Sequence, residues 1–235
     1  MRLIVLLFLF LPSFCFADKI TAKSWLVADG DGRILQSSNV DSVRSIASIT
    51  KLVTVMVVLD AKQNLDEYIK PYTRRELIQL AMIKSDNKAA EILCNNYVGG
   101  KTECIRAMNS KARSLNLIDT HFVEPTGLSV MNTSTARELI SIVKKAQEYP
   151  EIVEASKTNQ VKIKIRKKWI IFNNTNPIIG KRHNFIVSKT GYISASGGCI
   201  VMMLDTDVGR RIVVVLGSKN THTRIPEAEF IATKE

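Results

Sequence analysis

The stretch SIASITKLVTVMVVLD, residues 45–60, decides how the rest of the chain is interpreted. It is apolar on nearly every side of a helix. Its valines would suit a strand, but its length and its lack of turn-forming residues favour a buried helix. Ser48 and Lys51 lie three residues apart at its start. A cap would explain the serine but not a lysine that enters the apolar part, so the pair is a candidate for chemistry.

The pattern Ser-x-x-Lys occurs three times, as Ser48/Lys51, Ser85/Lys88 and Ser141/Lys144. A serine hydroxyl needs a base to become a nucleophile, and lysine is such a base only where burial or a nearby cation lowers its pKa. Lys51 is expected to be buried in such apolar surroundings. Lys144 lies beside Lys145 in an amphipathic segment, and Ser85 lies in a polar one where Asp86 and Asn87 resemble helix caps.

Two further patterns follow Ser48 and Lys51 along the chain: Ser85-Asp86-Asn87, then Lys189-Thr190-Gly191 on an expected strand. In this order they are the three elements of the penicillin-recognising serine enzymes. With the stretches FVEPTGLSVMNTSTARELI and SKTGYISASGGCIVM, the chain resembles the low-molecular-weight penicillin-binding proteins, the D-alanyl-D-alanine peptidases. It is most similar to their short DD-endopeptidase branch, and the resemblance covers roughly residues 24–218.

The resemblance implies a role for each catalytic residue. Ser48 would be acylated by the D-alanyl carbonyl, and Lys51 would take its proton. Ser85 would pass a proton toward the leaving amine. Lys189 would lower the pKa of Lys51 by like charge and hold an anionic group of the substrate, and Asn87 would bind the substrate backbone.

The same resemblance implies a binding strand. Thr190 would bind a carboxylate or carbonyl, and Gly191 would let the substrate backbone approach. The oxyanion would lie between the backbone N–H groups of Ser48 and Tyr192. Ile193 stands where the family often has threonine, and SAS (194–196) replaces a common acidic turn, so leaving-side specificity stays open.

The expected fold class is α+β (α/β/α), a β-lactamase/transpeptidase-like fold in one domain, residues 18–235. Strands at both ends of the chain would share one antiparallel sheet, in a lobe of about 18–60 and 155–220, with a helical lobe of about 61–150. Helix starts are expected at Thr73 with Glu76 and at Thr102 before Glu103. Pro226, in the short final segment, indicates that the usual last helix is truncated or absent.

Residues 1–17 have the basic start, short apolar core and small-residue site of a signal peptide cut after Ala17, which predicts a periplasmic protein. An uncleaved membrane anchor is the alternative. In that compartment Cys94 and Cys104 could close a disulfide around a Gly-Gly turn, or all three remaining cysteines could stay reduced. Cys199 is expected to be buried and free.

The net charge is +11. For an exported protein it favours anionic wall polymers or a membrane face over nucleic acid. The basic run from Lys162 to Lys168 could make such a contact, or could be only the solvated edge of a hairpin. No cofactor or metal is expected, because His121, His183 and His222 are scattered outside any ligand motif. We expect a monomer.

Four functions compete. The preferred one is a DD-endopeptidase that cuts D-alanyl–diaminopimelate cross-links of peptidoglycan and binds β-lactams covalently. A D-Ala-D-Ala carboxypeptidase is the main alternative. A β-lactamase would need a carboxylate-activated water, for which Glu124 lies in a suitable stretch. A non-catalytic wall-binding module would not require a lysine inside an apolar helix.

Overall fold

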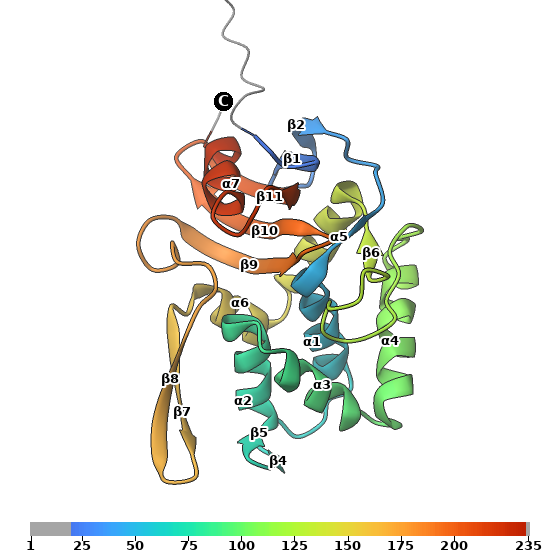
Figure 1. Cartoon of the computed structure of the whole chain (residues 1–235), viewed down its shortest axis with the longest axis vertical. Coiled ribbons are helices and arrows are strands. Elements are labelled where there is room, and N and C mark those ends of the chain that lie inside the picture. The colour runs from blue at the N-terminus through green and yellow to red at the C-terminus, as the bar shows by residue number, and fades with distance from the viewer. Residues whose placement is uncertain (1–19, 234–235) are drawn as a thin grey trace, which may run out of the picture.

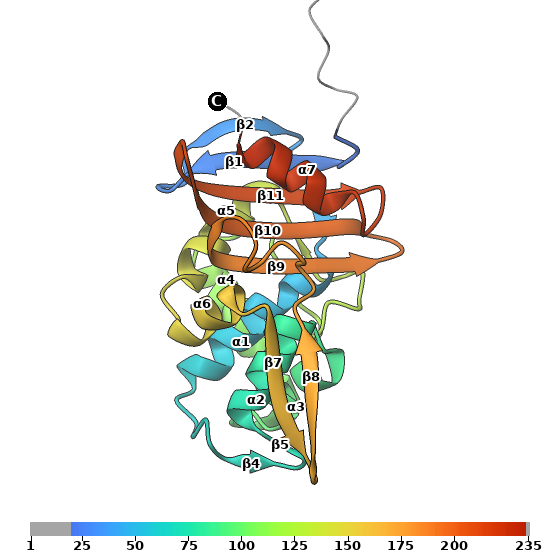
Figure 2. The same ribbon diagram turned by 90° about the vertical axis from the view of Figure 1, so that its left-hand side faces the viewer.

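The computed structural model describes residues 20–233, so the expected signal peptide lies outside the described residues. A central antiparallel sheet carries one helix on one face and a block of helices on the other (Figures 1 and 2). Its strands, in spatial order, are β2 (Ile34–Ser38), β1 (Ser24–Asp29), β11 (Gly209–Ser218), β10 (Gly197–Thr206) and β9 (Asn184–Ile193). Both ends of the described chain thus contribute to one sheet, and the expected α+β class is confirmed.

Both faces of the sheet are buried, and the side chains of β10 show how. Val201 and Met203 pack into the cluster shared with the helical block, whereas Ile200 and Met202 pack into a second cluster on the opposite face. Successive side chains of a strand point to opposite faces. A strand covered on both faces therefore needs apolar residues at every position, which explains the unbroken apolar runs in the sequence.

Helix α7 (Arg224–Ala232) covers the second face, so the last helix is present and the expectation of its absence was wrong. Pro226 is the third residue of this helix. The backbone N–H groups of a first helical turn have no partner within the helix, so a proline there removes no hydrogen bond. Ile225, Ala228 and Ile231 pack against the sheet and fix the helix in place.

The helical block surrounds α1, whose residues Thr50 to Val58 are all buried, as expected for the apolar stretch. A 3₁₀ turn, η2 (Ala47–Ile49), leads into it. The other helices are α2 (Arg74–Gln79), the π-helical turn η3 (Leu80–Lys84), α3 (Asn87–Asn95), α4 (Gly100–Ser114), α5 (Ala136–Ala146) and α6 (Pro150–Lys157). Helix α6 was not expected from the sequence. Within residues 20–233, no helix combines the length and the apolar character that crossing a membrane requires.

One of the two expected helix starts is confirmed. Thr73 and Glu76 form a reciprocal capping box at the start of α2. The start at Thr102 was wrong, because α4 begins at Gly100, after Gly99 in a left-handed conformation (φ 83°). The two glycines let the chain turn and begin the helix two residues earlier.

A disulfide joins the end of α3 to α4. The structure bonds Cys94 to Cys104, both fully buried, with their Cα atoms 5.3 Å apart. Cys199 is buried and free, as expected.

The basic run lies in a hairpin that projects from the main sheet, with strands β7 (Gln160–Ile165) and β8 (Lys168–Asn173) (Figure 1). These strands pair with each other alone, so their expected place in the shared sheet was wrong. Each strand finds its hydrogen-bonding partner in the other, and the helical block covers one face of the pair. Val161, Ile163 and Phe172 pack on the helical block, while the other face is exposed. The remaining two-residue pairs are β3 (Arg44–Ser45) with β6 (Thr133–Ser134), and β4 (Tyr68–Ile69) with β5 (Tyr72–Thr73).

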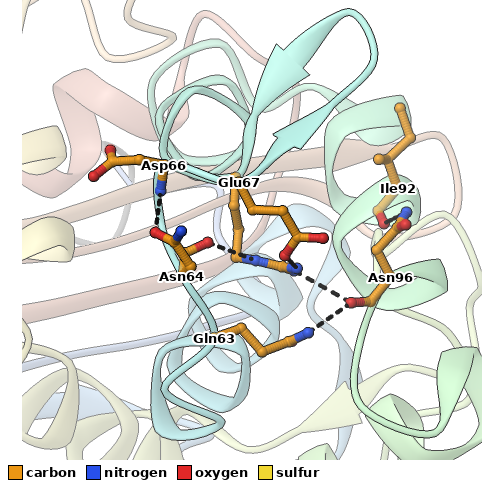
Figure 3. A network of polar contacts seen from close by, with 7 residues as sticks. Gln63, Asn64, Asp66, Glu67, Ile92 and Asn96 are labelled. Carbon is orange, nitrogen blue, oxygen red and sulfur yellow. Dashed lines mark hydrogen bonds and ion pairs between the residues drawn. The ribbon is translucent and has the colours of Figure 1, made fainter.

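A buried arginine fixes the far end of the helical block. Arg74, at the start of α2, is fully buried, and its Nη2 lies 2.6 Å from Oε2 of Glu67. Its other nitrogens donate to the backbone carbonyls of Asn64 (3.4 Å) and Asn96 (3.3 Å). Gln63 also donates to the Asn96 carbonyl, at 3.0 Å (Figure 3). The network ties the loop after α1 to the end of α3.

Candidate active site

Ser48 and Lys51 are in direct contact. Ser48 lies in η2 and Lys51 in the first turn of α1, and Nζ of Lys51 is 2.8 Å from Oγ of Ser48. The lysine is fully buried. Burial lowers its pKa from 10.5 to about 7, against the opposing charges of the Glu124 and Asp86 carboxylates. The prediction of a desolvated lysine is confirmed, and the contact suits transfer of the serine proton.

The second motif contacts this pair, and the third contacts the second. Nζ of Lys51 donates to Oδ1 of Asn87, at the start of α3, over 2.8 Å. Nζ of Lys189, on β9, donates to Oγ of Ser85 at 2.8 Å. Ser85 and Asn87 belong to the same motif, so all three sequence patterns lie in one region of the molecule.

Burial and nearby charges act on both lysines of the site. Burial lowers the pKa of Lys189 well below its ordinary value, and the positive charges of Lys51 and Arg224 lower it further. Burial also lowers the pKa of Lys51, against the carboxylates of Glu124 and Asp86. Because repulsion between two amines acts on both of them, the effect of Lys189 on the pKa of Lys51 stays a prediction.

Strand β9 packs directly against the segment that carries Ser48. A Cβ atom added to Gly191 would lie 2.9 Å from the backbone nitrogen of Ser48 and 3.0 Å from the carbonyl oxygen of Ile46. The glycine is therefore required by the protein's own packing, a reason the sequence did not suggest. Thr190 is buried and donates through Oγ1 to Oγ1 of Thr175 at 2.6 Å, while Tyr192, directly after Gly191, is 44% exposed.

Two residues of the site have unusual backbone conformations. Ala47, directly before Ser48, has a φ of 46°, and Ser85 has a φ of 58°. Residues other than glycine rarely adopt this left-handed region, and such residues gather at functional sites. The surrounding contacts must hold both turns in place.

The sequence interpretation missed the backbone carbonyl of Thr126. It accepts a hydrogen bond from Nζ of Lys51 at 2.5 Å and lies 3.4 Å from Oγ of Ser48. Glu-Pro-Thr-Gly is recognisable as a turn, but nothing in the sequence marks a peptide carbonyl as a partner of a particular side chain.

The remaining candidates lie outside this cluster. Lys88 is exposed, and Nζ of Lys144 donates to the backbone carbonyl of Asp31 at 2.6 Å near the surface. In the described part of the chain, no three His, Cys, Asp or Glu side chains are grouped so as to hold a metal ion.

Comparison with known proteins agrees with this arrangement. The family model described as D-alanyl-D-alanine carboxypeptidase matches residues 13–70 and 67–220. D-alanyl-D-alanine endopeptidases of Pseudomonas aeruginosa and Escherichia coli are 36% and 34% identical to the chain. These matches cover 90% and 92% of this chain and 76% and 77% of the relatives.

Solved structures give the same picture. Penicillin-binding protein D2 of Listeria monocytogenes, in a cefotaxime-bound form, has a TM-score of 0.81 at 25% identity, covering 90% of this chain and 96% of its own. The DD-transpeptidase of Streptomyces K15 has a TM-score of 0.82 at 26% identity, covering 90% and 95%.

The chain belongs to the D-alanyl-D-alanine carboxypeptidase family, and the resemblance found in its sequence is confirmed. It is accordingly a hydrolase of the serine DD-peptidase class.

Proposed function

We propose that this protein is a DD-endopeptidase that cuts D-alanyl–diaminopimelate cross-links of peptidoglycan through an acyl-enzyme on Ser48. The observation that carries the proposal is the buried amine of Lys51, 2.8 Å from the Ser48 hydroxyl. The preference for cross-links is supported by the relatives of 29–36% identity, which are named endopeptidases, whereas those named carboxypeptidases are 24–28% identical.

The reaction follows from the contacts. Neutral Lys51 takes the hydroxyl proton of Ser48 while Oγ attacks the D-alanyl carbonyl carbon. The backbone N–H groups of Ser48 and Tyr192 would stabilise the oxyanion. The C–N bond then breaks, the leaving amine gains a proton, and an ester remains on Ser48. Water attacks this ester, releasing the new carboxyl group and returning the proton to Oγ.

The neighbouring residues would deliver the proton and hold the peptide. Ser85, whose hydroxyl accepts a hydrogen bond from Lys189, would pass a proton toward the leaving amine. Asn87 is exposed at the start of α3, so its side chain can also meet an extended peptide lying along β9. Lys189 and Thr190 would bind a carboxylate or carbonyl of that peptide.

β-Lactams would acylate Ser48 by the same route. The Listeria relative is known in cefotaxime-bound and ampicillin-bound forms. Hydrolysis of the ester should be slow, because both carboxylate oxygens of Glu124 are occupied by donors of their own loop and are poorly placed to activate a water. This disfavours the β-lactamase alternative.

We also propose that the protein is exported and rests on the anionic membrane face through its hairpin. Five basic residues and no acidic one lie between residues 160 and 173. Lys164 pairs across the hairpin with Trp169, its Nζ 6.0 Å from the ring centre, and Trp169 and Ile171 are 66% and 51% exposed. Basic side chains attract anionic headgroups, and an exposed tryptophan favours the lipid interface over a purely ionic wall polymer.

Sedimentation with phosphatidylglycerol vesicles tests this contact. The parent protein should bind them and ignore phosphatidylcholine. Combining Lys164→Gln with Trp169→Ser should weaken binding at least about fivefold, since a basic residue near the surface contributes about 1 kcal/mol and the exposed ring adds to it. Lys219→Gln, at another exposed lysine, is the control. Equal binding by the double variant, or binding to isolated sacculi alone, would refute the contact.

Digestion of purified muropeptides tests the endopeptidase. Cross-linked dimers should disappear while uncross-linked pentapeptides persist, and Ser48→Ala should leave both intact. Loss of the terminal D-alanine from pentapeptides with dimers unchanged would show a carboxypeptidase instead.

A further inference from the structure

Glu124 organises the loop that faces Lys51. Its two carboxylate oxygens accept hydrogen bonds from five donors of the loop itself. They are the backbone N–H groups of Thr126 (2.6 Å), Gly127 (2.6 Å) and Ser129 (3.3 Å), the hydroxyl of Thr126 (2.6 Å) and the side-chain amide of Asn132 (2.9 Å). Hydrogen bonds to an ionised carboxylate are among the stronger ones in proteins. The turn around Thr126 is therefore fixed from within.

Asn132 joins this loop to the segment that carries the reactive pair. Its side-chain amide, fully buried, donates to Oγ1 of Thr50 at 3.2 Å and to the backbone carbonyl of Glu124 at 2.8 Å. The backbone carbonyl oxygen of Asn132 accepts a hydrogen bond from the backbone N–H of Ile46 at 3.1 Å. Thr54 of α1 donates to the Pro125 carbonyl at 2.8 Å.

The loop also packs on the backbone before Ser48. Gly127 has a φ of 82°, and a Cβ atom there would lie 2.0 Å from the carbonyl oxygen of Ala47. The Thr126 carbonyl thus lies between the start of α1 and a turn that the Glu124 carboxylate fixes. It accepts a hydrogen bond from Nζ of Lys51 at 2.5 Å.

A neutral lysine amine has two N–H donors and one lone pair. The Thr126 carbonyl and Oδ1 of Asn87 are two acceptors that can take the two N–H groups of Lys51. The lone pair then faces the third neighbour, Oγ of Ser48, which can donate its proton to it.

We propose that Glu124 is a positioning residue that, by fixing the Thr126 carbonyl, aims the lone pair of Lys51 at the Ser48 hydroxyl. The inference rests on the proposed roles of Ser48 and Lys51. Glu124 acts on the geometry through the turn, because its carboxylate oxygens accept hydrogen bonds from their own loop, and its charge also raises the pKa of Lys51.

The test is the rate constant of acylation by a fluorescent penicillin, measured separately from the preceding non-covalent affinity and followed from about pH 5.5 to about pH 9. In Glu124→Gln an amide group would face backbone donors, and the turn could no longer close. The acylation constant should fall about tenfold to hundredfold, the effect of a small misplacement of a reacting group. The non-covalent affinity should stay within about twofold.

The pH profile separates positioning from general damage. The charges facing Lys51 are the carboxylates of Glu124 and Asp86 and the amine of Lys189. The Glu124 charge raises the pKa of Lys51, so without it the acid limb, where the acylation rate falls as Lys51 becomes protonated, should move to lower pH. Glu124→Asp keeps the charge, so its acid limb should match the parent's and part of the rate should return. Glu148→Gln, at an exposed carboxylate, should change neither quantity.

Two results would overturn the inference. One is a parent-like acylation constant and acid limb in Glu124→Gln. The other is a lower rate with an unmoved acid limb, a lowered melting temperature and no recovery in Glu124→Asp, which would make the residue only structural. A parent protein that is not labelled at Ser48 would instead refute the proposed function.

Discussion

Lys51 is buried where a charged amine is costly. The fall of its pKa from 10.5 to about 7 corresponds to roughly 5 kcal/mol against the charged form. Two carboxylates oppose that fall, so desolvation outweighs them. The three partners of Nζ replace the water that the amine has lost, and one of them is the hydroxyl that it would activate. Burial makes Lys51 able to accept a proton, and its contact with Ser48 places the hydroxyl proton within its reach.

Gly191 offers a test of the contact between β9 and the segment before Ser48. Gly191→Ala would place a methyl group 2.9 Å from the Ser48 nitrogen, so one of the two segments must shift. We expect acylation to fall at least about tenfold and the protein to lose about 1–3 kcal/mol of stability, as in other overpacked sites. Penicillin labelling and thermal unfolding measure the two effects.

Gly30→Ala is the matched control, because the three atoms nearest its methyl group, at 3.1–3.3 Å, belong to the side chain of Arg210 and not to backbone. If Gly191→Ala acylates as fast as Gly30→Ala and the parent, the close packing has no bearing on the site.

At the scale of single residues, side-chain chemistry could be predicted and backbone contacts could not. The apolar surroundings of Lys51 distinguished its pair from Ser141 and Lys144, and the structure places these last two outside the cluster. The Thr126 carbonyl was missed because every residue carries such a group. The charges beside the two amines, carboxylates near Lys51 and the cation of Arg224 near Lys189, are determined only by the fold.

At the scale of elements, α1 and the central strands could be predicted because burial on all sides leaves long apolar runs. Helix α7 was misjudged because Pro226 was taken as a break, although its effect depends on its position within the helix. The hairpin of β7 and β8 has a strand pattern indistinguishable from that of a sheet member. Its separation depends on which partner each strand finds, and alternation alone does not specify partners.

At the scale of the whole molecule, the sheet separates two apolar clusters, and the site lies where β9 meets the helical block (Figures 1 and 2). Its residues come from η2, α1, the turn before α3, the loop around Thr126 and β9, which are far apart in the sequence. The order of the three motifs along the chain indicated the family. That the segments carrying them lie together could be seen only in the structure, because spacing in sequence says nothing about how distant segments pack.

The central claim is that Lys51 is a neutral base near neutral pH, and an NMR titration of isotopically labelled lysine Cε carbons tests it most directly. The resonance that disappears in Lys51→Arg identifies the residue. We predict a titration midpoint near 7, so that the amine is protonated below that pH and free to accept a proton above it. A midpoint near 10.5, the ordinary value for lysine, would contradict the account.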